Sequence, residues 1–276
     1  ELKDTLLAYS STKNYISSSP QSNWGTAENF NHGCMHYWGV WHGREPFKNF
    51  NTNVPRFMSE YGFQSYPELS TLQQVVGDDD MNLDSEVMKN RQKSYIGNEE
   101  IEKQILAYYG TASRSFDEFI ERSQVVQAEA VATAIKAHRL NRGHNMGTLV
   151  WQLNDCWQGP SWSLIDYDGK PKKAYNTVKE LYQPLIAVGD LSGSKFNVTI
   201  ISDLKESKVF RLKLSAVYSD KTVPFWSEKY EFPANSIDQI FSGSLSARNV
   251  KTAGLKYIKV ELENTREVFF TDLIRY

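Results

Sequence analysis

The pattern of apolar residues changes part of the way along this 276-residue sequence, and this change constrains the fold most. Strand-like runs at residues 14–18, 35–39, 56–60 and 147–153 are separated by longer connections, several of which have helical periodicity. The first pattern predicts a parallel sheet covered by helices. From about residue 188 only strand-like runs follow, which predicts an antiparallel sandwich of about seven strands. Those runs lie at 196–202, 209–218, 226–232, 237–242, 255–263 and 268–275.

Local capping signals mark the helices of the first part. Ser115 precedes a periodic apolar run and Glu118 follows three residues later, which predicts a capping box and a long helix. A second helix is expected to begin near Asn98 and to end at Gly110, where glycine can adopt the left-handed conformation. A further helix is expected over residues 170–182. Helices of this length between strands support the prediction of an α/β domain.

Composition excludes several classes of function. The net charge is −2 and no long basic run occurs, so we expect no nucleic-acid partner. No apolar stretch approaches the ~20 residues of a membrane span, so we expect no membrane partner. His36 could bind a metal, but the sequence has no HExxH or CxxC motif and no second cluster of ligands. We therefore expect neither a metal nor a cofactor.

Glu60, in the stretch RFMSEYGFQSYP, is the candidate catalytic residue. A carboxylate at the end of a buried strand must be paired or hydrogen-bonded, and the structural alternative is an ion pair with Arg56 or Arg44. In a β/α barrel, however, working residues lie at the carboxyl ends of the strands. Several aromatic and polar residues cluster at the predicted strand ends: Trp24, His36, Trp38, Trp41, Tyr61, Trp151 and Asn154. An aromatic cleft with a carboxylate at its floor favours glycoside hydrolysis.

Three stretches of the sequence resemble one enzyme family. SEYGFQSYP, HYWGVWHG and WQLNDCWQGPSWSLIDYDGKPKKAYNTVKELYQPL are similar to segments of the β-mannosidase branch of glycoside hydrolase family 2. The resemblance implies a retaining exo-hydrolase with a (β/α)8 barrel, in which Glu60 is the nucleophile and Trp151 lines the sugar subsite. It also implies that Trp24 and the loop from Trp38 to Trp41 belong to the substrate site, and that the substrate is a β-mannoside.

The resemblance departs from the family pattern at the acid/base residue. That residue is a Glu after an Asn at the end of barrel strand four, and no Asn-Glu pair lies at a strand end here. We therefore expect residues 1–187 to form barrel strands five to eight and residues 188–276 to form an immunoglobulin-like sandwich. Such a half-barrel would need the rest of the parent barrel, or self-association, to cover its edges.

Three functions remain open on the sequence. The parent protein is a β-mannosidase, or it cleaves another β-glycoside such as a galactoside or glucuronide, or the chain alone is an inactive half-barrel. Without a general acid, turnover should fall by ~10²–10⁴. Secreted, periplasmic and lysosomal forms of such an enzyme would share these sequence features, so no compartment is assigned.

Overall fold

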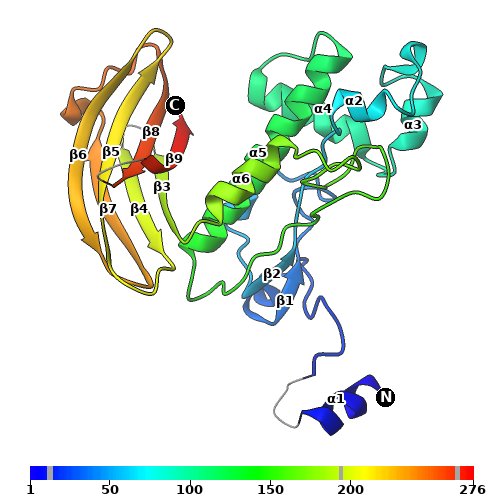
Figure 1. Ribbon diagram of the computed structural model, residues 1–276, viewed down its shortest axis with the longest axis horizontal. Coiled ribbons are helices and arrows are strands. Elements are labelled where there is room, and N and C mark those ends of the chain that lie inside the picture. The colour runs from blue at the N-terminus through cyan, green and yellow to red at the C-terminus, as the bar shows by residue number, and fades with distance from the viewer. Residues whose placement is uncertain (11–14, 193–194, 265–267) are drawn as a thin grey trace. The chain divides into compact units, whose positions relative to one another are not determined.

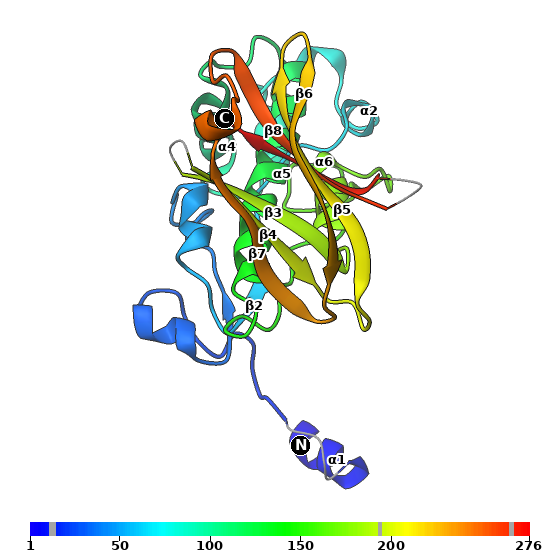
Figure 2. The same ribbon diagram turned by 90° about the vertical axis from the view of Figure 1, so that its left-hand side faces the viewer.

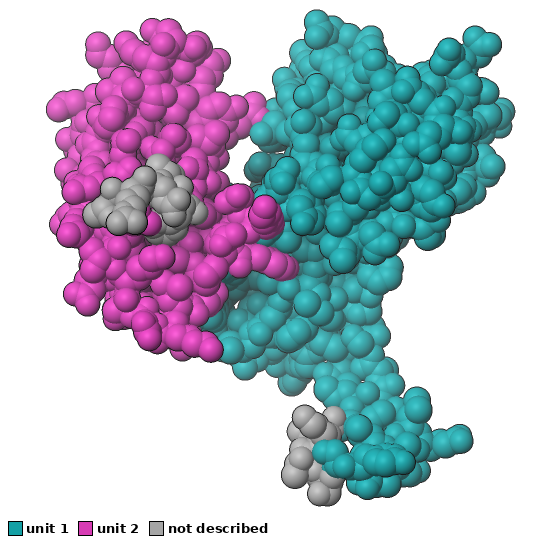
Figure 3. Space-filling view, viewed as in Figure 1, with its two compact units in different colours: residues 1–178 teal, residues 179–276 magenta. Residues whose placement is uncertain are grey.

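The computed structural model describes residues 1–10, 15–192, 195–264 and 268–276. Contacts within the chain divide it into two compact units, residues 1–178 and 179–276 (Figure 3). The second unit thus begins earlier than residue 188, where the sequence pattern changes. Within the described residues, no helix combines the length and the apolar character needed to cross a lipid bilayer.

Unit 1 contains a parallel pair of short strands, β1 (Cys34–His36) and β2 (Phe57–Glu60), which lie side by side in Figure 1. Single bridges extend this pair on both sides, from Met35 to Ser22 and from Met58 to Thr148, and both bridges are parallel. Four neighbouring segments therefore run in the same direction, as the strand–helix alternation of the sequence predicts.

Two of the four expected strands differ from their prediction. Residue 14 lies outside the described residues, and residues 15–18 form no strand; the neighbour of β1 is Ser22 instead. The run at 147–153 pairs with β2 through only a few backbone bonds, among them Met58 N to Gly147 O at 2.8 Å and Leu149 N to Met58 O at 2.8 Å. An apolar run marks a buried segment, but the number of ladder bonds depends on its neighbours, which are distant in sequence.

The capping signals of the sequence are confirmed. α5 (Phe116–Leu140) begins after Ser115, whose hydroxyl accepts a hydrogen bond from the Glu118 N–H at 3.2 Å. α4 (Gly97–Tyr109) ends at Gly110, which has a φ of 74°. The other helices are α1 (Leu2–Tyr9), α2 (Leu69–Leu72), α3 (Glu86–Arg91) and α6 (Lys173–Leu181), with 3-10 turns at Ala27–Asn31, Phe47–Asn51, Asp78–Asp80 and Ser246–Arg248.

Buried polar contacts fix α5 against the segment that follows β2. Gln127 Nε2 donates to the Phe63 carbonyl at 2.9 Å and to the Ser163 carbonyl at 3.1 Å. The Ser65 hydroxyl donates to Gln127 Oε1 at 2.7 Å. Because buried polar groups are costly unless paired, this amide specifies one register of the helix against the segment that leaves β2.

The described residues of unit 2 form seven strands in two antiparallel sheets (Figure 2). One sheet has the order β3-β4-β7 and the other has the order β6-β5-β8-β9. Buried residues alternate along the strands, as in Phe210, Leu212 and Leu214 of β5, and each fully buried side chain of this kind stabilises by about 1.5–3 kcal/mol. The strands are β3 (Leu185–Ser192), β4 (Lys195–Ser202), β5 (Lys208–Tyr218), β6 (Thr222–Phe232), β7 (Ser236–Ser244), β8 (Leu255–Glu263) and β9 (Val268–Arg275).

Candidate active site

Glu60 is the last residue of β2, and the indole N–H of Trp38 and a ring nitrogen of His36 lie beside one of its carboxylate oxygens. Trp38 Nε1 donates to Oε2 at 3.3 Å, and His36 Nδ1 lies 3.3 Å from the same oxygen. The Glu60 side chain is 23% exposed, so the carboxylate is only partly desolvated. Arg44 instead pairs with Glu99 at 2.7 Å and Arg56 donates to the Gly143 carbonyl, so neither forms the ion pair considered for Glu60.

His36 is held between Glu60 and a second polar group. It lies opposite Glu60 in the parallel register of β1 and β2. On the other side of its ring, Nε2 is 3.3 Å from the Ser19 hydroxyl, which also lies 3.4 Å from the Cys34 thiol. Both ring nitrogens of His36 therefore have partners, which fixes the orientation of the imidazole beside the carboxylate. The structure brings His36 and Trp38 together with Glu60.

The Cys34 thiol is polarised by its surroundings. Burial alone would raise its pKa, but hydrogen bonds with the Ser19 hydroxyl, the Gln21 backbone and the Ser59 hydroxyl outweigh that effect and lower it. The thiol is partly exposed and free.

Trp41 and Tyr61, both predicted to contact a sugar, do not lie on the surface of this chain. Both are fully buried. Trp41 packs edge-on against Phe63, with ring centroids 4.8 Å apart, and donates from Nε1 to the Ser94 hydroxyl at 3.2 Å. The two side chains pack in the core beneath the strand ends. Their partners come from parts of the chain that are distant in sequence, so the position of a residue at a strand end does not reveal its burial.

The Tyr61 ring belongs to a buried chain of polar contacts beneath the strand ends. Its hydroxyl accepts from the Thr148 hydroxyl at 2.9 Å, and Thr148 lies 2.8 Å from His138 Nδ1. The rings of Tyr61 and His138 meet edge to face at 5.0 Å. Burial lowers the pKa of His138 to about 3, so its imidazole stays neutral near neutral pH.

Trp151 lies directly beside the residues that follow Glu60. Its backbone N–H donates to the Tyr61 carbonyl at 2.8 Å, and the Trp151–Gln152 peptide bond is cis. Gly62 is required at the next position, because a Cβ there would clash with the Trp151 carbonyl oxygen. The Trp151 side chain remains 41% exposed, which leaves the indole available to a ligand.

Trp24 and Asn154 lie in less direct positions. Trp24 is half-buried and packs edge-on against Tyr37, at a centroid distance of 6.1 Å. Asn154 is exposed, and its contacts are with Gln152 and Asp155 of its own loop. The two residues therefore remain candidates for sugar contacts rather than parts of the cluster around Glu60.

The sequence analysis missed a buried lysine behind the site. The Lys172 ammonium is fully buried and donates to the Ser65 carbonyl at 3.3 Å and the Ser161 carbonyl at 3.4 Å. Burial lowers its pKa to about 8, against the opposing effect of nearby carboxylates, Asp155 above all. Lys172 lies in a turn-like DGKPKK stretch, a pattern that otherwise indicates an exposed charge.

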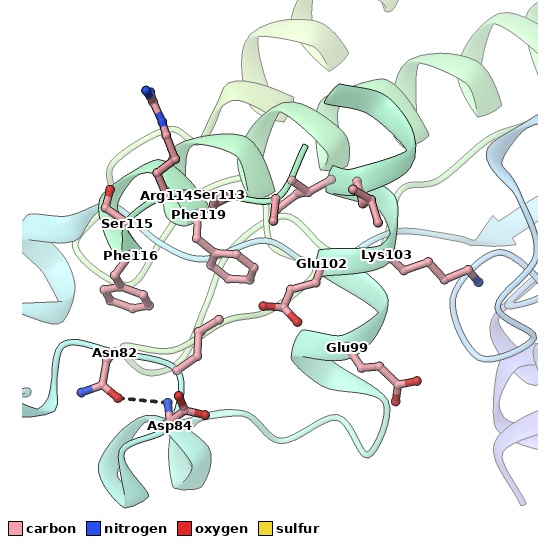
Figure 4. Close-up of a pocket in the computed structure, with 14 residues that line it drawn as sticks. Asn82, Asp84, Glu99, Glu102, Lys103, Ser113, Arg114, Ser115, Phe116 and Phe119 are labelled. Atoms are coloured by element: carbon pink, nitrogen blue, oxygen red, sulfur yellow. Dashed lines mark hydrogen bonds between the residues drawn. The ribbon is translucent and has the colours of Figure 1, made fainter. Parts of the chain in front are cut away.

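A separate cavity of about 540 Å³ lies between the loop before α3, α4 and the beginning of α5. Figure 4 shows Glu102 projecting from α4 toward this space and Asp84 from the loop on the other side. None of the predicted site residues lines it. Within the described part of the chain, no three His, Cys, Asp or Glu side chains gather as they would around a metal ion.

The curated proteins and solved structures similar to this chain include several β-mannosidases. No protein-family model matches the chain. It is similar to a β-mannosidase of Capra hircus, at 30% identity over 81% of this chain and 29% of that protein, and to a β-mannosidase B of Aspergillus niger, at 37% identity over 57% and 19%. Among solved structures, a β-D-mannosidase from Dictyoglomus thermophilum matches all of this chain and 34% of its own, with a TM-score of 0.84 and 28% identity. An Amycolatopsis orientalis exo-chitosanase shares the fold at 17% identity and a TM-score of 0.65.

A carboxylate at the carboxyl edge of parallel strands, beside an exposed tryptophan, is the class of site found in glycoside hydrolases. Within that class, the matches across most of its length place this chain with the β-mannosidases of glycoside hydrolase family 2. The chain spans less than a third of the curated relatives it matches, from 19% to 29% of their lengths.

Proposed function

We propose that this chain is the C-terminal part of a retaining exo-β-mannosidase and that Glu60 is the nucleophile. The observation that carries the proposal is the geometry at the end of β2. There, Glu60 is partly exposed, is oriented by His36 and Trp38, and adjoins the segment that presents Trp151. The β-mannosidases that this chain resembles support the choice of a mannoside.

The contacts of Glu60 assign different tasks to its two oxygens. The indole N–H of Trp38 donates to Oε2 at 3.3 Å and His36 Nδ1 lies 3.3 Å from the same oxygen, which favours one orientation of the carboxylate. Oε1 is then the oxygen that forms a bond to the anomeric carbon while the glycosidic C–O bond breaks. The leaving oxygen takes a proton from a general acid, and in the second step water displaces the Glu60 ester with the same group acting as base.

The exposed Trp151 indole suits the apolar face of the terminal sugar. The indole presents an uncharged π face, and the sugar presents uncharged C–H groups that can stack on it. Trp24 and Asn154 are proposed as further sugar contacts. A sugar stacked on Trp151 would have its anomeric carbon oriented toward Glu60.

A retaining mechanism needs a second carboxyl group about 5–5.5 Å from the nucleophile. We infer that this acid/base residue belongs to barrel strands outside this chain, and that the four parallel segments seen here are barrel strands five to eight. The remaining strands, or a second copy of the chain, would cover the edges beside Ser22 and Thr148. The seven-stranded unit 2 would then be an immunoglobulin-like module that follows the barrel.

Two alternatives stay open within this proposal. One alternative is that the parent enzyme prefers aryl β-galactosides or β-glucuronides in an assay. That result would change the substrate class and leave the proposed role of Glu60 unchanged. The chain on its own is expected to be inactive, because it would supply only one of two carboxylates. Turnover by the isolated chain at the rate of the parent would contradict that expectation.

The test of the nucleophile is Glu60→Gln in the full-length protein, assayed on an aryl β-mannoside. Removal of the attacking carboxylate should lower kcat by ~10³-fold or more, since an unactivated amide cannot form the covalent intermediate. Glu99→Gln is the matched control, because Glu99 is exposed and pairs with Arg44 on the surface.

Glu60→Gly with added azide gives a second readout. Azide can enter the space of the missing carboxylate and attack the anomeric carbon from the same face, so the product should be a glycosyl azide of inverted configuration. Near-normal activity of Glu60→Gln, or azide products of retained configuration, would show that Glu60 is not the nucleophile.

A further inference from the structure

The aromatic contacts that begin at Glu60 continue outward to an exposed tyrosine. Trp38, whose indole N–H binds Glu60, meets His42 edge-on with ring centroids 5.5 Å apart. Beyond it, the ring of Tyr95 lies parallel to His42, at 5.7 Å and an interplanar angle of 10°. Tyr95 is 80% exposed, although aromatic rings of this size are usually buried for most of their surface.

The short segment that carries Tyr95 is anchored on both sides. The Ser94 hydroxyl accepts from Nε1 of the buried Trp41 at 3.2 Å. The Lys93 ammonium lies 4.8 Å from the ring centre of Trp157, which belongs to the loop that follows Trp151. Tyr95 therefore combines exposure with a fixed backbone, and a pre-positioned exposed ring is characteristic of ligand contacts, because little conformational entropy is lost on binding.

Further bonds stiffen the same segment internally. The Ser94 N–H donates to the side chain of Gln92 at 2.9 Å, and Gln92 in turn donates to Asn98 at the start of α4 at 3.1 Å. Arg91, just before it, also lies over the Trp157 ring at 5.3 Å. The segment is thus tied to α4 and to the Trp157 loop.

We propose that Tyr95, supported by His42, is the platform on which the ring of the leaving group stacks. The proposal rests on the proposed function, in which the anomeric carbon lies at Glu60. Trp38 occupies the first ring position outward from Glu60, His42 the second, and Tyr95 flanks His42 on its outer side. A group attached through the glycosidic oxygen lies one ring beyond the terminal sugar, toward this platform.

The chemistry of the platform selects for uncharged rings. Burial lowers the pKa of His42, so its imidazole is neutral near neutral pH and adds no charge beneath Tyr95. A neutral stacked pair suits a sugar ring or an aryl group, both of which present an uncharged face. The substrate class assigned is therefore a β-glycoside whose leaving group is a ring, rather than a small alkyl group.

The test compares leaving groups in the full-length protein. Tyr95→Ala should lower kcat/KM about three- to tenfold for an aryl β-mannoside and for a β-mannosyl disaccharide, mainly through KM, and should leave methyl β-mannoside unchanged. Tyr95→Phe should retain the unmodified values, because the ring remains. Tyr167→Ala, which removes a half-exposed tyrosine in a turn, is the matched control.

The ratio between ring and methyl leaving groups decides the outcome. If Tyr95→Ala lowers kcat/KM equally on all substrates, or on none, the proposal that Tyr95 is the platform is wrong. This ratio is independent of which terminal sugar the enzyme prefers, so a parent that hydrolyses galactosides tests Tyr95 equally well. Failure of the Glu60 assignment would instead appear in the Glu60→Gln rates, with the Tyr95 ratio unaffected.

Discussion

Replacing Lys172 with methionine should change how the stability of unit 1 depends on pH. The Lys172 ammonium is fully buried, and its hydrogen bonds are to the carbonyl oxygens of Ser65 and Ser161. Asp155 is the carboxylate that most favours its charged form. Methionine has a similar length and no charge, so the variant removes the titrating group while it keeps most of the volume.

The sign follows from the two pKa values of this lysine. Between pH 8 and pH 10.5 the unfolded chain holds a proton on Lys172 that the folded chain has released. The free energy of unfolding therefore rises with pH across this window, and the contribution is lost as pH falls through 8. A lowering from 10.5 to about 8 corresponds, at about 1.4 kcal/mol per unit, to about 3 kcal/mol.

At pH 7 Lys172 is largely protonated in both the folded and the unfolded chain, so the stability difference measured there serves as the reference. The difference from the unmodified protein should then grow by about 3 kcal/mol toward pH 10.5, since only the unmodified protein gains from deprotonation. Urea unfolding followed by tryptophan fluorescence measures this for unit 1, because six of the seven tryptophans lie between Trp24 and Trp162. A difference that stays constant from pH 7 to pH 10.5 would refute the reasoning.

Two further predictions concern groups that contact the site or support it. Trp38→Phe keeps an aromatic ring but removes the N–H donor to Glu60. Because a hydrogen bond to a charged group is worth about 1.5–3 kcal/mol, kcat on an aryl β-mannoside should fall by about ten- to a hundredfold. An unchanged kcat would contradict the orienting role of Trp38. His138 has a pKa lowered to about 3, so the unfolded chain binds a proton there that the folded chain does not, and stability should fall by about 2 kcal/mol as pH drops from 6.5 to 5. Urea titrations should show this loss in the unmodified protein and not in His138→Gln.

Signals that lie within a few residues of one another predicted the structure well. The cap of α5 at Ser115 and the end of α4 at Gly110 are both confirmed, because each depends on bonds made inside one turn of helix. The strand-like runs at 209–218 and 255–263 likewise coincide with β5 and β8, which pair with each other along most of their length.

Signals that depend on distant segments could not be read in the same way. The sequence placed Trp41 at the rim of the site, but Phe63, Ser94 and Trp162 surround it in the structure. The parallel segments are short because each is paired by a few bonds to chain that lies far away in sequence, so strand propensity alone overestimates their length. For the same reason Ser22, and not residues 15–18, is the neighbour of β1.

The placement of Glu60 relative to Trp151 illustrates why the site itself is only partly visible in a sequence. The two residues are linked through the backbone: the Trp151 N–H binds the Tyr61 carbonyl, and Gly62 allows the Trp151 carbonyl to approach. Farther along the same two segments, Lys172 joins the Ser65 and Ser161 carbonyls. Residue types can suggest candidates such as Glu60 and Trp151, but main-chain carbonyl contacts leave no signature in the sequence. The geometry between Glu60 and Trp151 depends on Gly62 and on the contacts of the buried Lys172.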